Sequence, residues 1–212
     1  MTAWYLARAA GLLALVAFTV ATTLGAAGPR RGGLGGTLVA DRSADRRVLL
    51  QVAHRSSAVI GLALLALHVV LLVADAHVDL SWAGALVPFT AGWEPVALGL
   101  GTLGAYAFAV AAISGALRGR IAVGAASARR WRAVHLSAYA GWALALGHGL
   151  LSGTDSGAAW VVGLYAACAL SVALAVGLRL TRPSGPAVPS VRQQAASVGD
   201  RTDRLVRTGG RR

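Results

Sequence analysis

Long stretches of apolar residues are the feature that most limits the folds open to this chain. A helix needs about 20 residues, at a rise of 1.5 Å per residue, to cross about 30 Å of hydrocarbon. With 56% hydrophobic residues, 13% charged residues and a mean hydropathy of +0.63, the composition excludes a water-soluble globule. The sequence predicts an all-α integral membrane protein, a bundle of about five transmembrane helices at approximately 9–27, 48–74, 95–117, 131–151 and 158–180.

The positive charges indicate how these helices are oriented. The formal net charge is +12, and nucleic-acid binding would explain that charge but not the apolar stretches, so we expect no nucleic-acid partner. Short arginine-rich loops stay in the cytoplasm. Arginines gather in 28–47 and 118–130, whereas 75–94 and the turn around Asp155 have none. This alternation predicts an outside N-terminus, a cytoplasmic C-terminus and a multi-pass protein in contact with membrane lipid. The abundance of Ala, Gly and Arg suggests a bacterial cell membrane.

The chain divides into three regions by composition. Residues 1–47 hold the first apolar stretch and an arginine-rich cytoplasmic loop, 48–180 hold the other four stretches, and 181–212 are expected to be a disordered basic cytoplasmic tail. The first stretch has an alternative interpretation as a cleaved signal peptide, because Arg8 precedes it and small residues end it. The charge rule argues against that alternative, since the arginine-rich loop would then be exported.

Four histidines lie inside two of the predicted helices. Ionisable side chains are costly within a bilayer and often mark a functional site. His54 and His68 are 14 residues apart, which places them about 21 Å apart along a helix and within about 40° of one face. His135 and His148 are 13 residues apart, a spacing that rotates one by about 140° from the other in an ideal helix. We expect either a kink or local unwinding near Gly147 and Gly149, or a different approach angle to the second haem, to absorb this rotation.

These two helices are separated by one crossing and therefore run in the same direction through the membrane. His54 and His135 then share the cytoplasmic level, and His68 and His148 share the outer level. Each level offers one imidazole from each helix, as two axial ligands on opposite faces of one haem iron require. The sequence thus predicts two haem b groups, and iron with both axial positions filled would perform one-electron transfer.

Two alternatives to the haem interpretation remain open. A zinc site would need three or four converging ligands, and neither histidine helix contains an acidic residue. Each histidine taken singly could also be an interfacial or hydrogen-bonded helix residue. His77 in the outer loop is expected to be solvated, and Cys168, the single cysteine, is expected to fill the core.

Several further residues could contact the haems. Gly61 and Gly141 lie between the two histidines of their helices, where a missing side chain would admit a flat porphyrin; the alternative is close helix packing. Arg55 and Arg132 could bind the propionates of the cytoplasmic haem, or could be part of the positive-inside signal. Tyr139, with Trp131 and Trp142, could line a haem or belong to the aromatic belt at the membrane surface. The propionates of the outer haem have no obvious arginine partner.

Two segments carry a resemblance to a known family. They are HRSSAVIGLALLALHVVLL from His54 and RRWRAVHLSAYAGWALALGHGLLSG from Arg129. Both resemble the ferric reductase-like transmembrane domain, the haem-bearing unit of ferric reductases, NADPH oxidases and the membrane subunit of a periplasmic methionine-sulfoxide reductase system. That family carries histidines at spacings of 14 and 13 in two helices. The segment LVPFTAGWEPVALGLGTL from Leu86 resembles small actinobacterial members of it.

The resemblance covers about 48–180 and implies that this region is a haem-binding transmembrane domain, with His54, His68, His135 and His148 as its iron ligands. The sequence has no FAD or NAD(P)H motif, so the electron donor is expected to be a cytoplasmic flavin reductase or a quinone. The acceptor on the outer side would be ferric iron or an exported redox protein. The chain would then be the membrane component of an oxidoreductase. The alternative function is a non-redox membrane scaffold or a small-solute or metal carrier whose histidines line a polar path.

Overall fold

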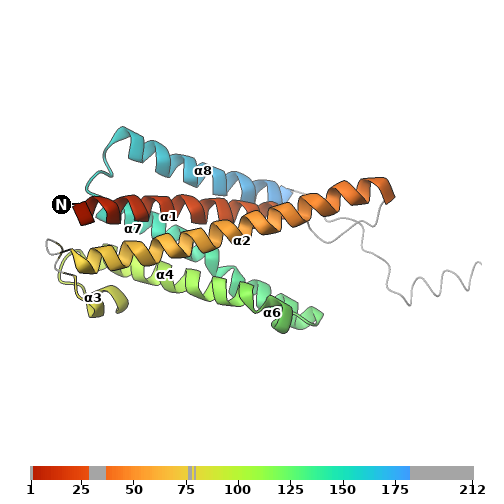
Figure 1. Cartoon of the computed structure of the whole chain (residues 1–212), viewed down its shortest axis with the longest axis horizontal. Helices are drawn as coiled ribbons and strands as arrows, with labels where there is room; N and C mark the ends of the chain where they lie inside the picture. Colours follow the sequence, from red (N-terminus) through yellow and green to blue (C-terminus); the bar gives the residue numbers. More distant parts are fainter. Residues whose placement is uncertain (1, 29–36, 76–77, 79, 182–212) are drawn as a thin grey trace, which may run out of the picture. The chain divides into compact units, whose positions relative to one another are not determined.

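The described part of the chain is helical. The computed structural model describes residues 2–28, 37–75, 78 and 80–181, with side chains omitted for 37–44, and this part contains no strand. Figure 1 shows its helices, which are α1 (Thr2–Ala27), α2 (Thr37–Ala74), α3 (Trp82–Leu86), α4 (Pro95–Ala116), α5 (Arg118–Ile121), α6 (Ala125–His135), α7 (Ser137–Ser152) and α8 (Ala159–Thr181). Four of these, α1, α2 from Asp45 onward, α4 and α8, are long and apolar enough to cross a membrane. The predicted all-α class is confirmed, and these helices are compatible with a multi-pass membrane protein.

The chain separates into two compact units. One comprises residues 1–28 and 46–181, and the other comprises 29–45 and 182–212, of which only the start of α2 is described. The cytoplasmic loop expected at 28–47 is helical from Thr37 onward. The expected basic tail and His77 lie outside the described residues. The first apolar stretch is therefore a helix of the same unit as the four histidines.

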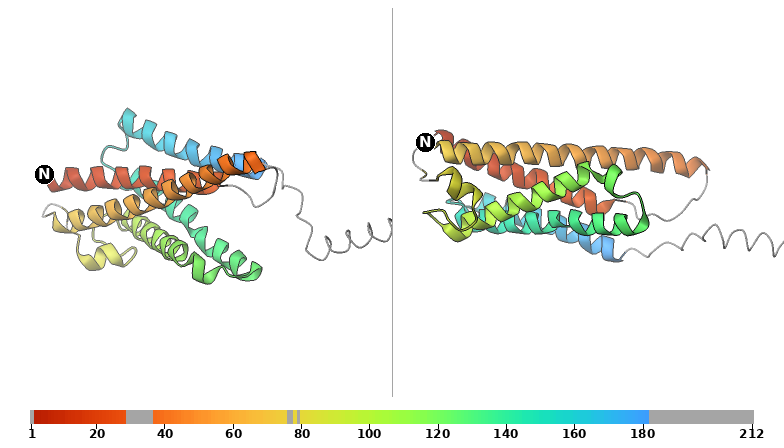
Figure 2. Two further views of the ribbon diagram at one scale, coloured as in Figure 1. Left: turned by 45° about the vertical axis from the view of Figure 1, so that its right-hand side comes forward. Right: turned by 90° about the horizontal axis from the view of Figure 1, so that it is seen from below.

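Within the first unit, α4 and α7 pack most closely. A Cβ atom on Gly104 would lie 3.2 Å from the carbonyl oxygen of Gly141, and one on Gly141 would lie 3.1 Å from that of Gly104. Two helix backbones can approach this closely only where both residues lack a side chain. Figure 2 shows α4 and α7 beside each other in both views. Gly104, in the third apolar stretch, thus permits close packing of α4 against α7.

Helix α1 joins this pair to α8. Leu15 on α1 packs with Val161 and Tyr165 of α8. The indole Nε1 of Trp142 in α7 donates a hydrogen bond of 2.9 Å to Thr19 Oγ1 in α1. Trp142 is therefore a contact between α7 and α1. Large apolar side chains elsewhere are exposed, including Leu170 and Leu174 on α8, as is typical of helix faces that contact lipid.

The fourth apolar stretch is not one continuous helix. Helix α6 ends at His135 and α7 begins at Ser137, with Leu136 between them. The amide of Tyr139 donates to the carbonyl of Leu136, three residues back, at 3.0 Å. Such a tight turn advances about 120° per residue instead of about 100°, which offsets part of the rotation that a spacing of 13 imposes. The kink expected at Gly147 and Gly149 is wrong, because α7 runs through both residues; the interruption is at Leu136.

The arginine-rich connection expected at 118–130 also contains helix. Arg118 begins the short α5, and Arg129, Arg130 and Arg132 lie on α6.

Ser137 Oγ, at the start of α7, donates to the carbonyl of Ala107 in α4 at 3.1 Å. The helical interruption beside His135 is thus fastened to the neighbouring helix α4.

Candidate functional site

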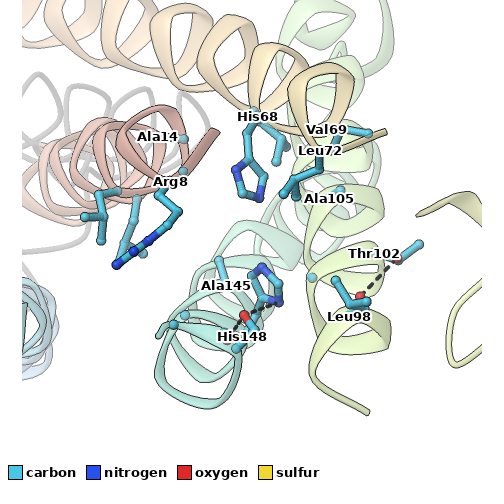
Figure 3. A pocket seen from close by; sticks show the side chains of 18 of the residues that line it. Arg8, Ala14, His68, Val69, Leu72, Leu98, Thr102, Ala105, Ala145 and His148 are labelled. Carbon is cyan, nitrogen blue, oxygen red and sulfur yellow. Dashed lines mark hydrogen bonds between the residues drawn. The ribbon is translucent and has the colours of Figure 1, made fainter. Parts of the chain in front are cut away.

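The four histidines meet in two pairs across the helices that carry them. The ring centroids of His54 and His135 are 6.2 Å apart with 68° between the ring planes, and those of His68 and His148 are 6.2 Å apart with 74° between the planes. Figure 3 shows His68 from α2 and His148 from α7 facing the same pocket. The structure therefore brings together the histidines that the sequence pairs, His54 with His135 and His68 with His148.

The separation of the rings is informative about what fits between them. An imidazole–metal bond is about 2.0 Å long, so two imidazoles bound end-on to one metal ion place their ring centroids about 6 Å apart. A direct hydrogen bond between two ring nitrogens would bring the centroids closer, to about 5 Å. Both pairs therefore have the spacing of two ligands on one central atom.

Each histidine is held through its Nδ1 atom by a helix that carries no histidine. A backbone carbonyl can only accept a hydrogen bond, so Nδ1 carries the proton and Nε2 keeps its lone pair. This tautomer is the one that a metal ion needs at Nε2. The four Nδ1 contacts are His54 with Ala21 O (2.8 Å), His68 with Ala7 O (2.7 Å), His135 with Ala111 O (3.0 Å) and His148 with Ala97 O (2.8 Å).

Two of the histidines have a serine nearby as well. Ser114 Oγ lies 3.1 Å from His135 Nδ1, and Ser152 Oγ lies 3.3 Å from His148 Nδ1. Each hydroxyl also donates to a backbone carbonyl of its own helix, Ser114 to Ala111 and Ser152 to His148. With its proton committed to that carbonyl, the serine oxygen can accept part of the Nδ1–H bond.

Every imidazole also lies against a glycine, four residues after the alanine whose carbonyl it contacts. A Cβ atom would lie 2.9 Å from His68 Nδ1 at Gly11 and 3.0 Å from His148 Nδ1 at Gly101. It would lie 3.3 Å from Cε1 of His54 at Gly25, and 3.3 Å from Cε1 of His135 at Gly115. We call each alanine–glycine pair a histidine seat. A side chain at any of these glycines would force the imidazole away from its carbonyl.

A stacked pair of phenylalanines lies between the two helices that provide the seats. The ring centroids of Phe18 in α1 and Phe108 in α4 are 3.7 Å apart with 9° between the planes. A Cβ atom on Gly61 would lie 2.9 Å from the ring of Phe18, and one on Gly141 would lie 3.3 Å from the ring of Phe108. The room expected beside these two glycines for a porphyrin is thus occupied by phenylalanine, and close packing, the stated alternative, matches their contacts.

The seats and the phenylalanines form one repeated sequence pattern. Ala, three residues, Gly, six residues, Phe, two residues, Ala, three residues and Gly occurs at 7–25 in α1 and again at 97–115 in α4. Helix α1 provides the seats for both histidines of α2, and α4 provides those for His135 and His148. Reasoning from the histidines alone missed α1 and α4, although this internal repeat was the signal that could have found them.

The other residues expected near a haem have varied surroundings. Arg55, next to His54, and Arg132, three residues before His135, are both exposed. Tyr139 is half-buried in the first turn of α7. Their contacts with a cofactor stay predictions. Trp131 is in direct contact with one of the four histidines. Its ring stacks on that of His135, with centroids 5.1 Å apart and 18° between the planes.

Trp131 is fixed from two further sides. Its Nε1 donates to the carbonyl of Ser114 at 2.8 Å. The guanidinium carbon of Arg118 lies 5.0 Å from the centroid of its ring. A cation over an indole face is attracted by the ring quadrupole. Arg118, Trp131 and His135 therefore form a continuous stack at this level.

A largely apolar pocket adjoins the His68–His148 pair. Leucine, alanine and glycine make up half of the residues that line it, and Arg8, which Figure 3 labels, lines it together with Trp4, Asp155, Ser156 and Tyr165. Arg8 forms an ion pair with Asp155 there. A largely apolar pocket lined by two imidazoles and an arginine suits a flat, apolar ligand that bears anionic groups. The orientation predicted from the sequence puts Arg8 on the outer side of the membrane, but no haem contact was predicted for it.

The described residues contain no group of three or more His, Cys, Asp or Glu side chains that could hold a metal ion. The four imidazoles instead form two separate pairs. Comparison of the chain with protein-family models, with curated proteins and with solved structures found no significant match to any of them.

Proposed function

We propose that this chain is a transmembrane b-type cytochrome that holds two haems, one between His54 and His135 and one between His68 and His148. The observation that carries the proposal is that both pairs have ring centroids 6.2 Å apart while all four Nδ1 atoms are engaged by backbone carbonyls. Four imidazoles presented with Nε2 free, two to a level, match the donor set of bis-histidine haem.

The surroundings of the histidines fit the same proposal. A haem bound by two imidazoles would supply a reversible one-electron change at its iron. The seats orient each ligand and raise its basicity through the Nδ1 hydrogen bond, and the glycines allow the rings to lie against the neighbouring helix. The apolar side chains beside His68 and His148 exclude water.

The proposed physiological role is transfer of electrons across a bacterial cytoplasmic membrane. We propose a cytoplasmic flavin reductase or a quinone as donor, and ferric iron or an exported redox protein as acceptor. The histidine spacings of 14 and 13, which resemble those of the ferric reductase-like family, support this role. Arg129 and Arg130 on α6 offer positive charge on which an acidic donor protein could dock.

The absorption spectrum of the purified protein tests the proposal. We expect a red protein with sharp absorption bands on reduction by dithionite and two haems per chain by pyridine haemochrome assay. His68→Ala and His148→Ala should each reduce the count to one, and His54→Ala and His135→Ala should do so at the other level. A folded, colourless protein with no haem, as a scaffold or solute carrier would be, contradicts the proposal.

A further inference from the structure

The pocket beside the His68–His148 pair is also lined by Arg8, a charged residue that is not one of the proposed iron ligands. Arg8 directly follows Ala7, whose carbonyl contacts His68 Nδ1. Three residues after Arg8 comes Gly11, and the His68 ring lies against it. The backbone that seats His68 therefore also fixes the position of Arg8. Figure 3 shows Arg8, His68 and His148 around the same pocket.

The guanidinium of Arg8 is mostly removed from solvent. Its side chain is 20% exposed, while that of its partner Asp155 is 47% exposed. A charge in such surroundings requires an anionic partner, and Arg8 Nη2 donates to Asp155 Oδ2. The Arg8 guanidinium also lies over the ring of Trp4, 5.9 Å from its centroid. A guanidinium has five N–H donors, so donors on Nε and Nη1 remain available to a second acidic group.

The internal repeat shows that a histidine seat does not need an arginine at this position. The residue after the seat alanine is Arg8 at the first seat. The corresponding residues at the other three seats are Thr22, Leu98 and Ala112. Because those seats hold their histidines in the same manner, Arg8 adds a property to one level only. That property is a guanidinium, paired with Asp155, among the residues that line the pocket.

We propose that Arg8 binds a propionate carboxylate of the tetrapyrrole held between His68 and His148, and that Asp155 is the counter-ion that occupies Arg8 otherwise. This inference rests on the proposed function. A guanidinium and a carboxylate form two parallel, charge-assisted hydrogen bonds. Ser156 and Tyr165 are polar residues that line the same pocket. Arg8 is thus the arginine partner that the outer level lacked in the sequence.

The test compares haemin with its dimethyl ester, which lacks the carboxylate charges. Full-length apoprotein from haem-deficient cells is titrated in detergent with each porphyrin. The His54→Ala variant lacks one ligand of the other haem, so its titration reports binding at the His68–His148 pair alone. The unaltered chain is titrated in parallel, so that a folding defect of the variant is recognised. We expect haemin to bind about tenfold or more tightly than its ester, a preference that Arg8→Gln abolishes by weakening haemin alone.

Two variants serve as controls. Arg179 also contacts α1, donating to the carbonyls of Gly25 and Ala26 at 3.2 and 3.1 Å, and Arg179→Gln should keep the preference for haemin. Asp155→Asn should keep or increase it, because Arg8 is then released from its counter-ion. An equal loss of both porphyrins in Arg8→Gln, or a loss of preference in Asp155→Asn, overturns the role of Arg8. Failure of the unaltered chain to bind either porphyrin overturns the proposed function itself.

Discussion

Phe18 of α1 and Phe108 of α4 stack face to face, 3.7 Å between ring centroids, and each occupies the space left by a glycine of another helix. Each phenylalanine is also seven residues from both seat glycines of its own helix. Seven residues are about two helical turns, so the seats and the phenylalanine lie along nearly one face. One face of α1 and one face of α4 therefore position both histidine pairs and the aromatic contact between the helices.

Gly61→Ala should destabilise the protein because its new methyl group would lie 2.9 Å from the ring of Phe18. Overpacking of this kind costs about 1–3 kcal/mol of unfolding free energy. The matched control is Gly163→Ala on α8, where a Cβ atom meets nothing within 4 Å and the change should be neutral or slightly stabilising. Thermal unfolding in detergent measures both. Equal midpoints for the two variants would contradict the contact.

Alanine substitutions at the four seat glycines should lower the haem content by different amounts, in an order that the structure predicts. Gly11→Ala and Gly101→Ala place a methyl group 2.9 and 3.0 Å from an imidazole, whereas Gly25→Ala and Gly115→Ala place it at 3.3 Å. The first two should therefore lose more haem than the last two. Haem content per folded chain is the measurement, with Gly177→Ala, which meets nothing within 4 Å, as the control. Haem loss that is the same for all five variants would show that the seats have no role.

Replacement of Trp131 should affect only the haem held by His54 and His135. Trp131→Leu removes the ring that stacks on His135 and the donor to Ser114, and Trp131→Phe removes the donor but keeps a ring. We expect the leucine variant to shift the electron paramagnetic resonance spectrum and midpoint potential of that haem, and the phenylalanine variant to shift them less. Trp160→Leu, at a side chain that is 62% exposed, should shift neither. An altered signal from the other haem instead would contradict this assignment.

The hydrogen bond from Trp142 to Thr19 should be measurable as a coupling between α7 and α1. Trp142→Phe removes the donor and Thr19→Val removes the acceptor. Each single variant should lower the unfolding free energy, and the double variant should lower it by about 1 kcal/mol less than the sum of the two. A double-mutant cycle of thermal or denaturant unfolding provides the value. Strict additivity would mean that the two side chains do not interact.

Much of this arrangement follows from local features of the sequence. The lengths of the apolar stretches predicted the helices, and the histidine spacing with the alternating direction of the helices predicted which imidazoles pair. The boundary at Leu136 could not be read from the sequence, because leucine is a good helix former and no glycine or proline lies between Ala125 and Ala140. The interruption depends on Ser137 and Tyr139 making contacts outside an ideal helix. The sequence also could not decide between the two interpretations of Gly61, since the ring that fills the space beside it comes from α1.

The sequence by itself determined the all-helical character of the chain and the two pairs of imidazoles, because hydrophobic length and helical periodicity are properties of a single segment. The tertiary structure alone decided what holds those imidazoles. The carbonyls of Ala7, Ala21, Ala97 and Ala111 are backbone groups, identical in every residue, and only the packing of α1 and α4 selects these four as acceptors. Arg8 likewise acquires its place beside His68 and Asp155 through contacts between residues far apart in the chain.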